Sequence, residues 1–240
     1  MSNKKIPPPG AIRIVSPSAK TRNQKRYIKA IENYDIVICE GPAGTGKTHL
    51  AIGMAINMYQ RRMVDKIIIA RPVVEAGENM GFLPGDIDSK MDPYVRPAFD
   101  ELEHFLEPRD IEILRKDHHL EIVPIAYMRG RTFRNSFIVC DECQNLTSEQ
   151  MKMLLTRVGT GSRIVLTGDI EQSDLKHQFR GAFEFTYYLL DKDEECAAVK
   201  LTEEDIQRHS IVTKIVKNWK KEFDNFKKHA KLEGDEVVLD

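Results

Sequence analysis

The clearest pattern along the chain is a set of short apolar runs, each of which ends in polar residues or glycine. Runs of this kind, rich in isoleucine and valine, are typical of strands that are buried on both faces of a parallel sheet. They predict strands within Ile36–Glu40, Lys66–Ala70, Leu120–Ile125, Ser136–Glu142 and Arg163–Asp169. Pro124 favours an edge position or a strand end for the third run, because proline cannot donate to a sheet ladder.

Apolar residues recur at helical spacing between these runs. The spacing predicts helices at Thr21–Ile31, His49–Ile56, Pro93–Leu106, Ile111–Leu114 and Thr147–Val158, and a last helix that begins at Thr202. Thr147 followed by Gln150 is a capping-box pattern, and acidic residues after Thr202 are typical of a helix N-terminus. Strands that alternate with helices predict an α/β fold with a mostly parallel central sheet flanked by helices.

Length and composition fit one domain of this class. The chain has 240 residues, of which 41% are hydrophobic and 30% charged, as in ordinary globular proteins. We expect a flexible N-terminal arm at residues 1–10, a single domain at residues 11–232 and an acidic C-terminal tail at residues 233–240. The net charge of −1 leaves any nucleic-acid binding to local basic patches.

Neither a membrane segment nor a cysteine-rich site is indicated. No apolar stretch approaches the ~18 residues that span a bilayer, and the N-terminus lacks a signal-peptide apolar segment, so we expect a cytoplasmic protein with no membrane partner. Cys140 and Cys143 form a C-x-x-C pair, but zinc would need a second pair. Reduced structural thiols are the better interpretation, with a redox motif as the alternative.

One stretch carries a strong chemical signal. Gly41-Pro42-Ala43-Gly44-Thr45-Gly46-Lys47-Thr48 fits the pattern G-x-x-x-x-G-K-[ST] and lies between a predicted strand and a predicted helix. Glycines allow consecutive backbone N–H groups to surround a phosphate, and the helix N-terminus adds a partial positive charge. The pattern predicts that Gly41 to Thr48 bind a nucleotide, with Lys47 at the β- and γ-phosphates and the Thr48 hydroxyl on Mg²⁺.

Acidic and polar residues follow two other predicted strands. Asp141 and Glu142 end the fourth run, where Asp141 can hold Mg²⁺ through water and Glu142 can orient and activate an attacking water. Thr167 and Asp169 lie at the end of the fifth run and Gln172 follows it, and all three can read the γ-phosphate. Since ligand-contacting loops leave the carboxyl ends of parallel strands, these groups are predicted to share one site.

Three further features allow more than one interpretation. Gln24 offers the donor and the acceptor that an adenine edge requires, or it is a solvated helix residue. Arg71 lies at the ligand edge of its strand, ahead of the glycine-containing loop Gly77–Asp92, and a role in the site is plausible for both. The stretch Tyr127–Phe133 combines arginines with aromatic residues, which suits phosphate or single-stranded nucleic acid, or it is a solvated turn.

Taken together, these motifs resemble the PhoH family of phosphate-starvation-inducible ATPases. The resemblance runs from about residue 20 to residue 216 and is most specific in the segment Arg71–Asp86; other matching motifs are Met128–Thr132, Asp141–Asn145, Glu149–Met153, Thr167–Asp169 and Arg208-His209. It implies a RecA-like P-loop NTPase core similar to one motor domain of superfamily 1 helicases. It also implies ATPase activity, RNA association and a homo-oligomer in the form of a hexameric ring.

The resemblance also implies roles for individual residues. Gln24 reads adenine, Lys47 and Thr48 bind phosphate and Mg²⁺, and Asp141 and Glu142 are the metal and water carboxylates. Gln172 is a γ-phosphate sensor, and Arg208, with Arg180 as the less favoured choice, is the arginine finger. Cys143 stands where the family usually has alanine, a harmless change because both residues are small.

The predicted function is therefore Mg²⁺-dependent ATP hydrolysis, with Lys47, Glu142, Gln172 and Arg208 as the catalytic residues, coupled to RNA binding or remodelling in an oligomer. One alternative is a binding or scaffold protein that ATP switches with little turnover. A small-molecule kinase ranks third, because the arginines at 129, 131 and 134 are the only candidates for its lid.

Overall fold

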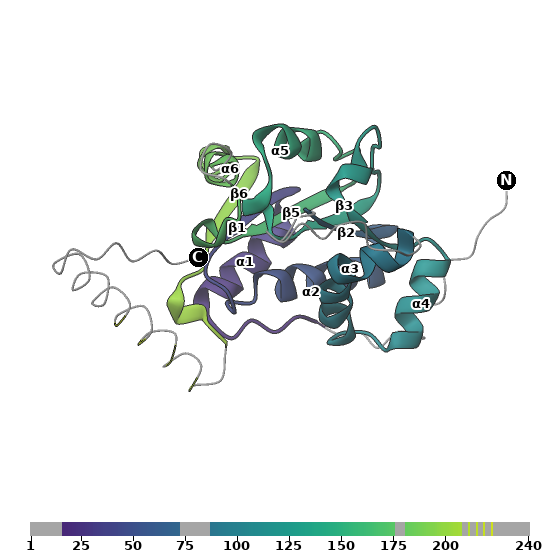
Figure 1. Ribbon diagram of the computed structural model, residues 1–240, viewed down its shortest axis with the longest axis horizontal. Coiled ribbons are helices and arrows are strands. Elements are labelled where there is room, and N and C mark those ends of the chain that lie inside the picture. The colour runs from purple at the N-terminus through teal and green to yellow at the C-terminus, as the bar shows by residue number, and fades with distance from the viewer. Residues whose placement is uncertain are drawn as a thin grey trace. The chain divides into compact units, whose positions relative to one another are not determined.

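The computed structural model describes residues 16–72, 87–175 and 181–207, together with Ile211, Ile215, Asn218 and Glu222; for residues 87–94 it describes the backbone alone (Figure 1). The chain divides into two units, residues 1–205 and residues 206–240. The sheet and the helices described below belong to the first unit. The predicted arm and the predicted acidic tail lie outside the described residues, and the grouping of residues 11–232 into one domain stays a prediction.

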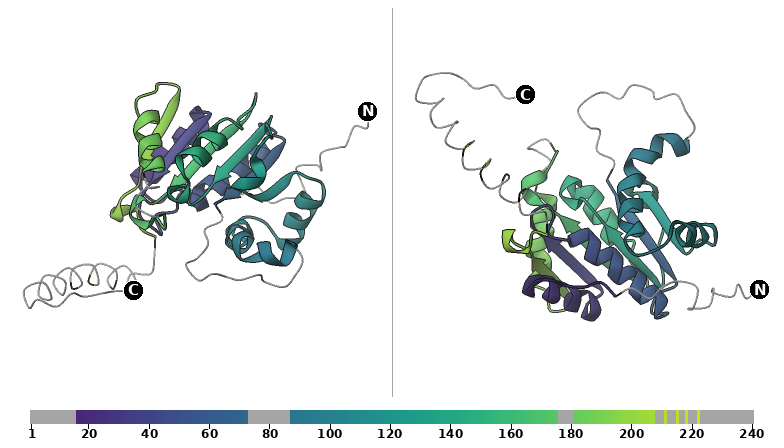
Figure 2. Two further views of the ribbon diagram at one scale, coloured as in Figure 1. Left: turned by 45° about the horizontal axis from the view of Figure 1, so that its top comes forward. Right: turned by 90° about the horizontal axis from the view of Figure 1, so that it is seen from below.

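Six strands form one sheet in the order β3-β2-β4-β5-β1-β6, and every neighbouring pair is parallel. The strands are β1 (Ile36–Glu40), β2 (Lys66–Arg71), β3 (Leu120–Pro124), β4 (Ser136–Cys140), β5 (Arg163–Gly168) and β6 (Cys196–Lys200). They run side by side in the left-hand view of Figure 2. The predicted parallel sheet is confirmed, and β3 occupies an edge, as its proline favours.

Helices cover both faces of this sheet. They are α1 (Arg22–Asn33), α2 (Lys47–Gln60), α3 (Ile87–Glu103), α4 (Pro108–Lys116), α5 (Ser148–Leu155) and α6 (Ala182–Leu190). In Figure 1, α5 and α6 lie above the sheet and α1 to α4 lie below it. Side chains alternate between the two faces along a strand. Ile67 and Ile69 therefore pack in the core between the sheet and α1 to α4, whereas Ile68 packs in the core between the sheet and α5 and α6.

The strand order brings three segments of the sequence together. β5 lies between β1, which leads into the glycine-rich loop, and β4, which ends directly before Asp141. In a parallel sheet all carboxyl ends lie at the same edge, so the loop after each of these strands opens on the same side. The predicted RecA-like P-loop NTPase core is confirmed by this arrangement.

The predicted start of the last helix at Thr202 is wrong. Residues Glu203–Asp205 form a short 3₁₀ helix, and residues 206 and 207 are not helical. The Asp205 carboxylate accepts hydrogen bonds from the Thr202 backbone N–H (2.7 Å), the Thr21 hydroxyl (2.5 Å) and the Asn23 amide (3.0 Å). These contacts fasten the segment to α1, so the acidic residues do not open a continuous helix. Burial alone would raise the pKa of Asp205, but the hydrogen bonds, led by that from Thr21, outweigh it and hold the pKa below its usual value.

The sequence patterns did not predict α6 and β6. β6 is an edge strand of half-buried small residues, and its apolar run is too weak to stand out. The capping box predicted for Thr147 and Gln150 is confirmed, with Thr147 Oγ1 accepting from the Gln150 N–H and Gln150 Oε1 accepting from the Thr147 N–H. Within the described ranges, no helix is long and apolar enough to cross a lipid bilayer.

Candidate nucleotide-binding site

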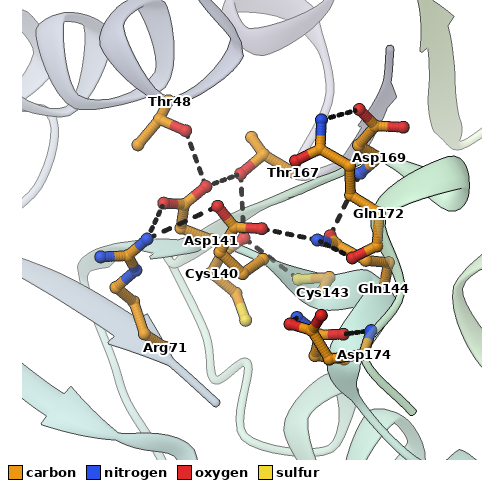
Figure 3. Close-up of polar contacts among 12 residues, drawn as sticks. Thr48, Arg71, Cys140, Asp141, Cys143, Gln144, Thr167, Asp169, Gln172 and Asp174 are labelled. Carbon is orange, nitrogen blue, oxygen red and sulfur yellow. Dashed lines mark hydrogen bonds and ion pairs between the residues drawn. The ribbon is translucent and has the colours of Figure 1, made fainter. Parts of the chain in front are cut away.

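The carboxyl edge of the sheet, formed by the ends of β1, β2, β4 and β5, collects most of the predicted site residues. The loop Gly41–Gly46 follows β1, Asp141 follows β4, and Thr167 is the second-to-last residue of β5, before the polar segment that contains Gln172. Arg71 is the last residue of β2. Thr48, Thr167 and Arg71, from three separate parts of the sequence, therefore each contact the Asp141 carboxylate (Figure 3).

The glycine-rich loop has the backbone that its glycines allow. Gly44 and Gly46 have φ angles of 80° and 83°, in the left-handed region that suits residues without a Cβ. At Gly41 the restriction is space, since a Cβ would lie only 2.7 Å from the Leu201 carbonyl oxygen. Gly46 is also the N-cap of α2, so the N-terminus of this 14-residue helix opens on the loop. A helix N-terminus in this position favours a bound anion.

Lys47 closes over the loop that precedes it. Its Nζ donates to the carbonyl oxygens of Gly41 (2.6 Å) and Pro42 (2.9 Å), and the residue is buried. The Thr45 hydroxyl donates to the same Pro42 carbonyl (2.8 Å). A buried lysine whose partners are uncharged carbonyls can exchange them for anionic phosphate oxygens, which form stronger, charge-assisted bonds.

Thr48 and Asp141 are brought together as the sequence predicts. The Thr48 hydroxyl donates to Asp141 Oδ1 at 2.6 Å, and the Thr167 hydroxyl donates to the same oxygen at 2.7 Å. One carboxylate and one hydroxyl are hard oxygen ligands, and Mg²⁺ in nucleotide sites commonly takes only one or two protein carboxylates besides phosphates and water. The donor set therefore fits the predicted metal, and it needs no larger cluster: the described residues contain no group of three or more His, Cys, Asp or Glu side chains placed to bind a metal.

Glu142 is held by two side chains. Its Oε2 accepts a hydrogen bond from Gln144 Nε2 (2.5 Å), and its Oε1 lies 3.5 Å from an Arg71 guanidinium nitrogen. Its φ angle is 58°, which is uncommon for a residue with a side chain and costs about 1 kcal/mol or more. Such a backbone persists where the surrounding contacts fix it.

Gln144 links the segments after β4 and β5, a position that sequence reasoning missed. Its Oε1 accepts from the Asp169 N–H (3.1 Å), while its Nε2 serves Glu142 and approaches the Gln172 carbonyl oxygen (3.5 Å). The predicted γ-phosphate sensor Gln172 donates from Nε2 to Asp169 Oδ2 at 2.8 Å (Figure 3). Gln144 thus connects Glu142, the predicted water-activating carboxylate, to the segment of the predicted sensor Gln172. The sequence signal that could have predicted this role is the position of Gln144 two residues after Glu142.

Gln24 lies against the loop, but its amide is already engaged. Its Nε2 donates to the Thr45 carbonyl oxygen (2.9 Å), and its Oε1 accepts from the N–H groups of Lys20 (2.7 Å) and Thr21 (3.3 Å). Gln24 is buried, so the solvated interpretation is wrong. The two lone pairs of Oε1 are filled, which leaves one N–H for an adenine nitrogen. Its role as an adenine reader stays a prediction.

The other predicted residues divide into two groups. Arg180 and Arg208, like residues 73–86, lie outside the described residues. In the Tyr127–Phe133 turn, Arg131 pairs with Glu121 (2.6 Å) and lies over the buried Phe133 ring, whereas Tyr127 and Arg129 are exposed. Among the arginines and aromatic residues of this turn, Arg131 and Phe133 thus make internal contacts, whereas Tyr127 and Arg129 face solvent.

The cysteines agree with the structural interpretation. All four are free, and Cys39, Cys140 and Cys143 are buried. The Cys143 thiol donates to the Cys140 carbonyl oxygen at 3.1 Å. Burial raises the pKa of Cys143 well above its usual value, which disfavours the reactive thiolate.

Comparison with known proteins identifies relatives over most of the chain. Residues 16–220 match the family model described as PhoH-like protein. A PhoH-like protein of Synechocystis is 45% identical over 203 residues, which cover 85% of this chain and 62% of the relative. The corresponding Bacillus subtilis protein is 42% identical (85% and 64% covered), and Protein PhoH of Escherichia coli is 38% identical (80% and 55% covered). The chain thus spans less than two thirds of the length of these relatives.

Solved structures with a similar backbone are more distant. A Pif1 helicase from Candida albicans has a TM-score of 0.40 and 14% identity, with 78% of this chain and 41% of the helicase covered. The Sulfolobus solfataricus SWI2/SNF2 ATPase core has a TM-score of 0.43 and 16% identity, with 80% and 47% covered. These values add nothing to the fold that the strand order already defines.

Proposed function

The chain belongs to the family of PhoH-like proteins, and we propose that it binds ATP with Mg²⁺ at the Gly41–Thr48 loop and hydrolyses it. The observation that carries this proposal is the 2.6 Å contact between the Thr48 hydroxyl and Asp141, which joins the loop to the strand end that also bears Glu142. A phosphate loop, a metal carboxylate and an adjacent second carboxylate are the parts that phosphoryl transfer to water requires.

Each residue has a defined task in this mechanism. The N–H groups of the loop and the α2 N-terminus bind the phosphates, and Lys47 exchanges its two carbonyl partners for phosphate oxygens. Thr48 and Asp141 would hold Mg²⁺, which would supply positive charge that neutralises the phosphates. Glu142 orients the attacking water and accepts its proton, while Gln172 senses the γ-phosphate. Arg208, or Arg180, stabilises the charge that develops in the transition state.

We extend the proposal to single-stranded RNA and to a homo-oligomeric ring in the cytoplasm. The family resemblance supports both, and the exposed pair Tyr127 and Arg129 supports an RNA contact, because a ring can stack on a base and a guanidinium can bind a phosphate. An arginine finger supplied by a neighbouring subunit would make hydrolysis depend on assembly. Because the curated relatives are longer than this chain, the activity of a whole protein of that length is part of the proposal.

The test is steady-state ATP hydrolysis by the full chain and by Glu142→Gln, with and without single-stranded RNA, together with the molar mass in solution. We expect Glu142→Gln to bind ATP normally and to lose about 10²–10⁴-fold in turnover, the usual contribution of a general base. Glu149→Gln, a substitution in the first turn of α5, is the matched control and should leave turnover unchanged.

A different outcome favours the alternative function. If the wild type binds ATP but shows no turnover that depends on Glu142, with RNA present or absent and at any oligomeric state, the protein is an ATP-switched scaffold. Transfer of phosphate to a metabolite would instead favour the kinase.

A further inference from the structure

Arg71 occupies an unusual place for a positive charge. It ends β2, and its guanidinium nitrogen lies 3.3 Å from Asp141 Oδ2 and 3.5 Å from Glu142 Oε1. Figure 3 shows its side chain pointing toward Asp141 from the side opposite to Thr167. The same nitrogen thus faces both carboxylates to which the proposed mechanism gives separate tasks, one on the metal and one on the water.

We propose that Arg71 is a positioning residue that weakens cation binding at the metal site, because its guanidinium competes with the divalent cation for Asp141 and with the attacking water for Glu142. This inference rests on the proposed function, since it assumes that these two carboxylates serve Mg²⁺ and water. It goes further in naming the group that sets the affinity for the cation.

The first argument is the occupation of Asp141. Oδ1 accepts hydrogen bonds from Thr48 and Thr167, which use both of its lone pairs, and Oδ2 faces Arg71. The Asp141 side chain is only 11% exposed and that of Arg71 only 20%. Solvent therefore screens this pair less than a surface ion pair, and the positive charge of Arg71 opposes a second cation at the same carboxylate.

The second argument is the occupation of Glu142. Arg71 lies at Oε1 and Gln144 binds Oε2, so each oxygen of the carboxylate has a side-chain partner. A general base must reach its water within about 3 Å, and the Arg71 guanidinium takes one of the positions at Oε1 from which a water could be bound. Departure of Arg71 would release Oε1 and at the same time uncover Asp141 Oδ2. One movement would open both positions.

The third argument is that Arg71 has another carboxylate nearby. The His49 ring nitrogen Nδ1 lies 3.1 Å from Glu101 Oε2, which places Glu101 beside the N-terminal turn of α2. The hydrogen bond with His49 lowers the pKa of Glu101, burial opposes that effect, and the charges of His49, His104 and Arg71 lower it further. The charge of Arg71 thus acts on Glu101 as well as on the two carboxylates that it contacts.

The competition has a direct test with Mn²⁺ as the probe. Binding of fluorescent ADP to the full-length chain is measured in EDTA, and Mn²⁺ is then titrated into the ADP complex while electron paramagnetic resonance reports free Mn²⁺. Replacing Arg71 by a neutral glutamine should tighten Mn²⁺ binding by about tenfold or more, which corresponds to about 1.4 kcal/mol. Arg71→Lys keeps the charge and should restore an affinity near that of the wild type.

Controls separate this effect from a general change of charge or stability. Arg96→Gln removes an exposed arginine that pairs with Asp100 on α3, and it should not change the affinity for Mn²⁺. Thermal unfolding shows whether Arg71→Gln remains folded. An affinity gain that Arg71→Lys reverses would establish that the charge, and not the packing of Arg71, sets the affinity.

The opposite results overturn the inference. Unchanged or weaker Mn²⁺ binding in Arg71→Gln would show that no competition exists, and weaker ADP binding in EDTA would make Arg71 a phosphate ligand. Failure of the wild type to bind ADP would instead contradict the proposed function. In that case Mn²⁺ titrations without nucleotide, with Asp141→Asn as reference, still decide the competition: if Arg71→Gln gives no Asp141-dependent gain in affinity, the inference fails as well.

Discussion

The carboxyl edge of the sheet and the Tyr127–Phe133 turn were both predicted to contact ligands, but their side chains are arranged in different ways. At the carboxyl edge, Thr48 donates to Asp141 and the Asp169 N–H donates to Gln144, so these contacts join segments that are far apart in the sequence. In the turn, Arg131 pairs with Glu121 and covers a buried ring. The comparison teaches that the end of a parallel strand determines where a side chain points, whereas the composition of a turn does not.

Among these predictions, the largest effect on activity should come from removing the Gln144 side chain, which connects the segments after β4 and β5 at the carboxyl edge. Gln144→Ala removes both the amide that donates a hydrogen bond to Glu142 and the oxygen that accepts one from the Asp169 N–H. We expect turnover to fall about 10–100-fold while ATP binding stays close to normal, because residues that orient a catalytic group typically contribute this much. Stopped-flow measurement of ATP binding and steady-state hydrolysis separate the two quantities.

Gln150→Ala is the matched control for that experiment. It removes a glutamine that caps α5 and should lower stability by about 0.5–1 kcal/mol without changing turnover. Equal losses of turnover in both variants would mean that Gln144 acts only through stability, and the link would then have no special role.

A smaller effect should distinguish the exposed half of the turn from its internal half. Tyr127 is 61% exposed, and Tyr127→Ala should weaken binding of single-stranded RNA by about tenfold, within the 1–3 kcal/mol range of one stacked base. Arg131→Ala should lower thermal stability and change the RNA affinity less, because its charge is already paired with Glu121. Fluorescence anisotropy with a labelled oligonucleotide measures both variants; a larger loss of RNA affinity from Arg131→Ala would reverse the assignment of the two halves.

The smallest effect concerns the acid beneath the turn. Burial raises the pKa of Glu121, but its contacts with Lys66 and Arg131 outweigh burial, so the pKa lies below its usual value. A lowered pKa in the folded state stabilises the protein above the unfolded-state pKa of about 4.3, and this contribution disappears as the pH falls through the folded-state pKa. Glu121→Gln should therefore lower the free energy of unfolding by about 1 kcal/mol at neutral pH and by much less in acid.

Urea unfolding of Glu121→Gln and the wild type at pH 7 and near pH 3.5 checks the sign. Glu112→Gln, on the exposed face of α4, supplies a control that should show no such pH-dependent difference. A difference between wild type and Glu121→Gln that grows toward acid would contradict the direction of the pKa shift.

Much of the fold follows from local sequence patterns. The runs at Ile36–Glu40 and Lys66–Ala70 became β1 and β2, since an apolar run buried on both faces has few alternatives to a central strand. Where the pattern was weak, as in β6, the strand was missed. The acidic residues after Thr202 gave a wrong prediction of a helix start. Asp205 instead binds Thr21, the N-cap of α1, and this contact between residues almost the whole first unit apart in sequence outweighed the local preference for a helix.

The sequence by itself determined that this protein has a parallel α/β sheet with a phosphate loop after one strand and an acidic pair after another. Periodicity and the fixed spacing of Gly41 to Thr48 depend on neighbouring residues, so they can be read without a structure. Only the tertiary structure decided that β5 lies between β1 and β4, that Gln144 holds Glu142, and that Arg71 faces both carboxylates. The physical reason is that these contacts join strands far apart in the chain, and no local pattern specifies which strands become neighbours.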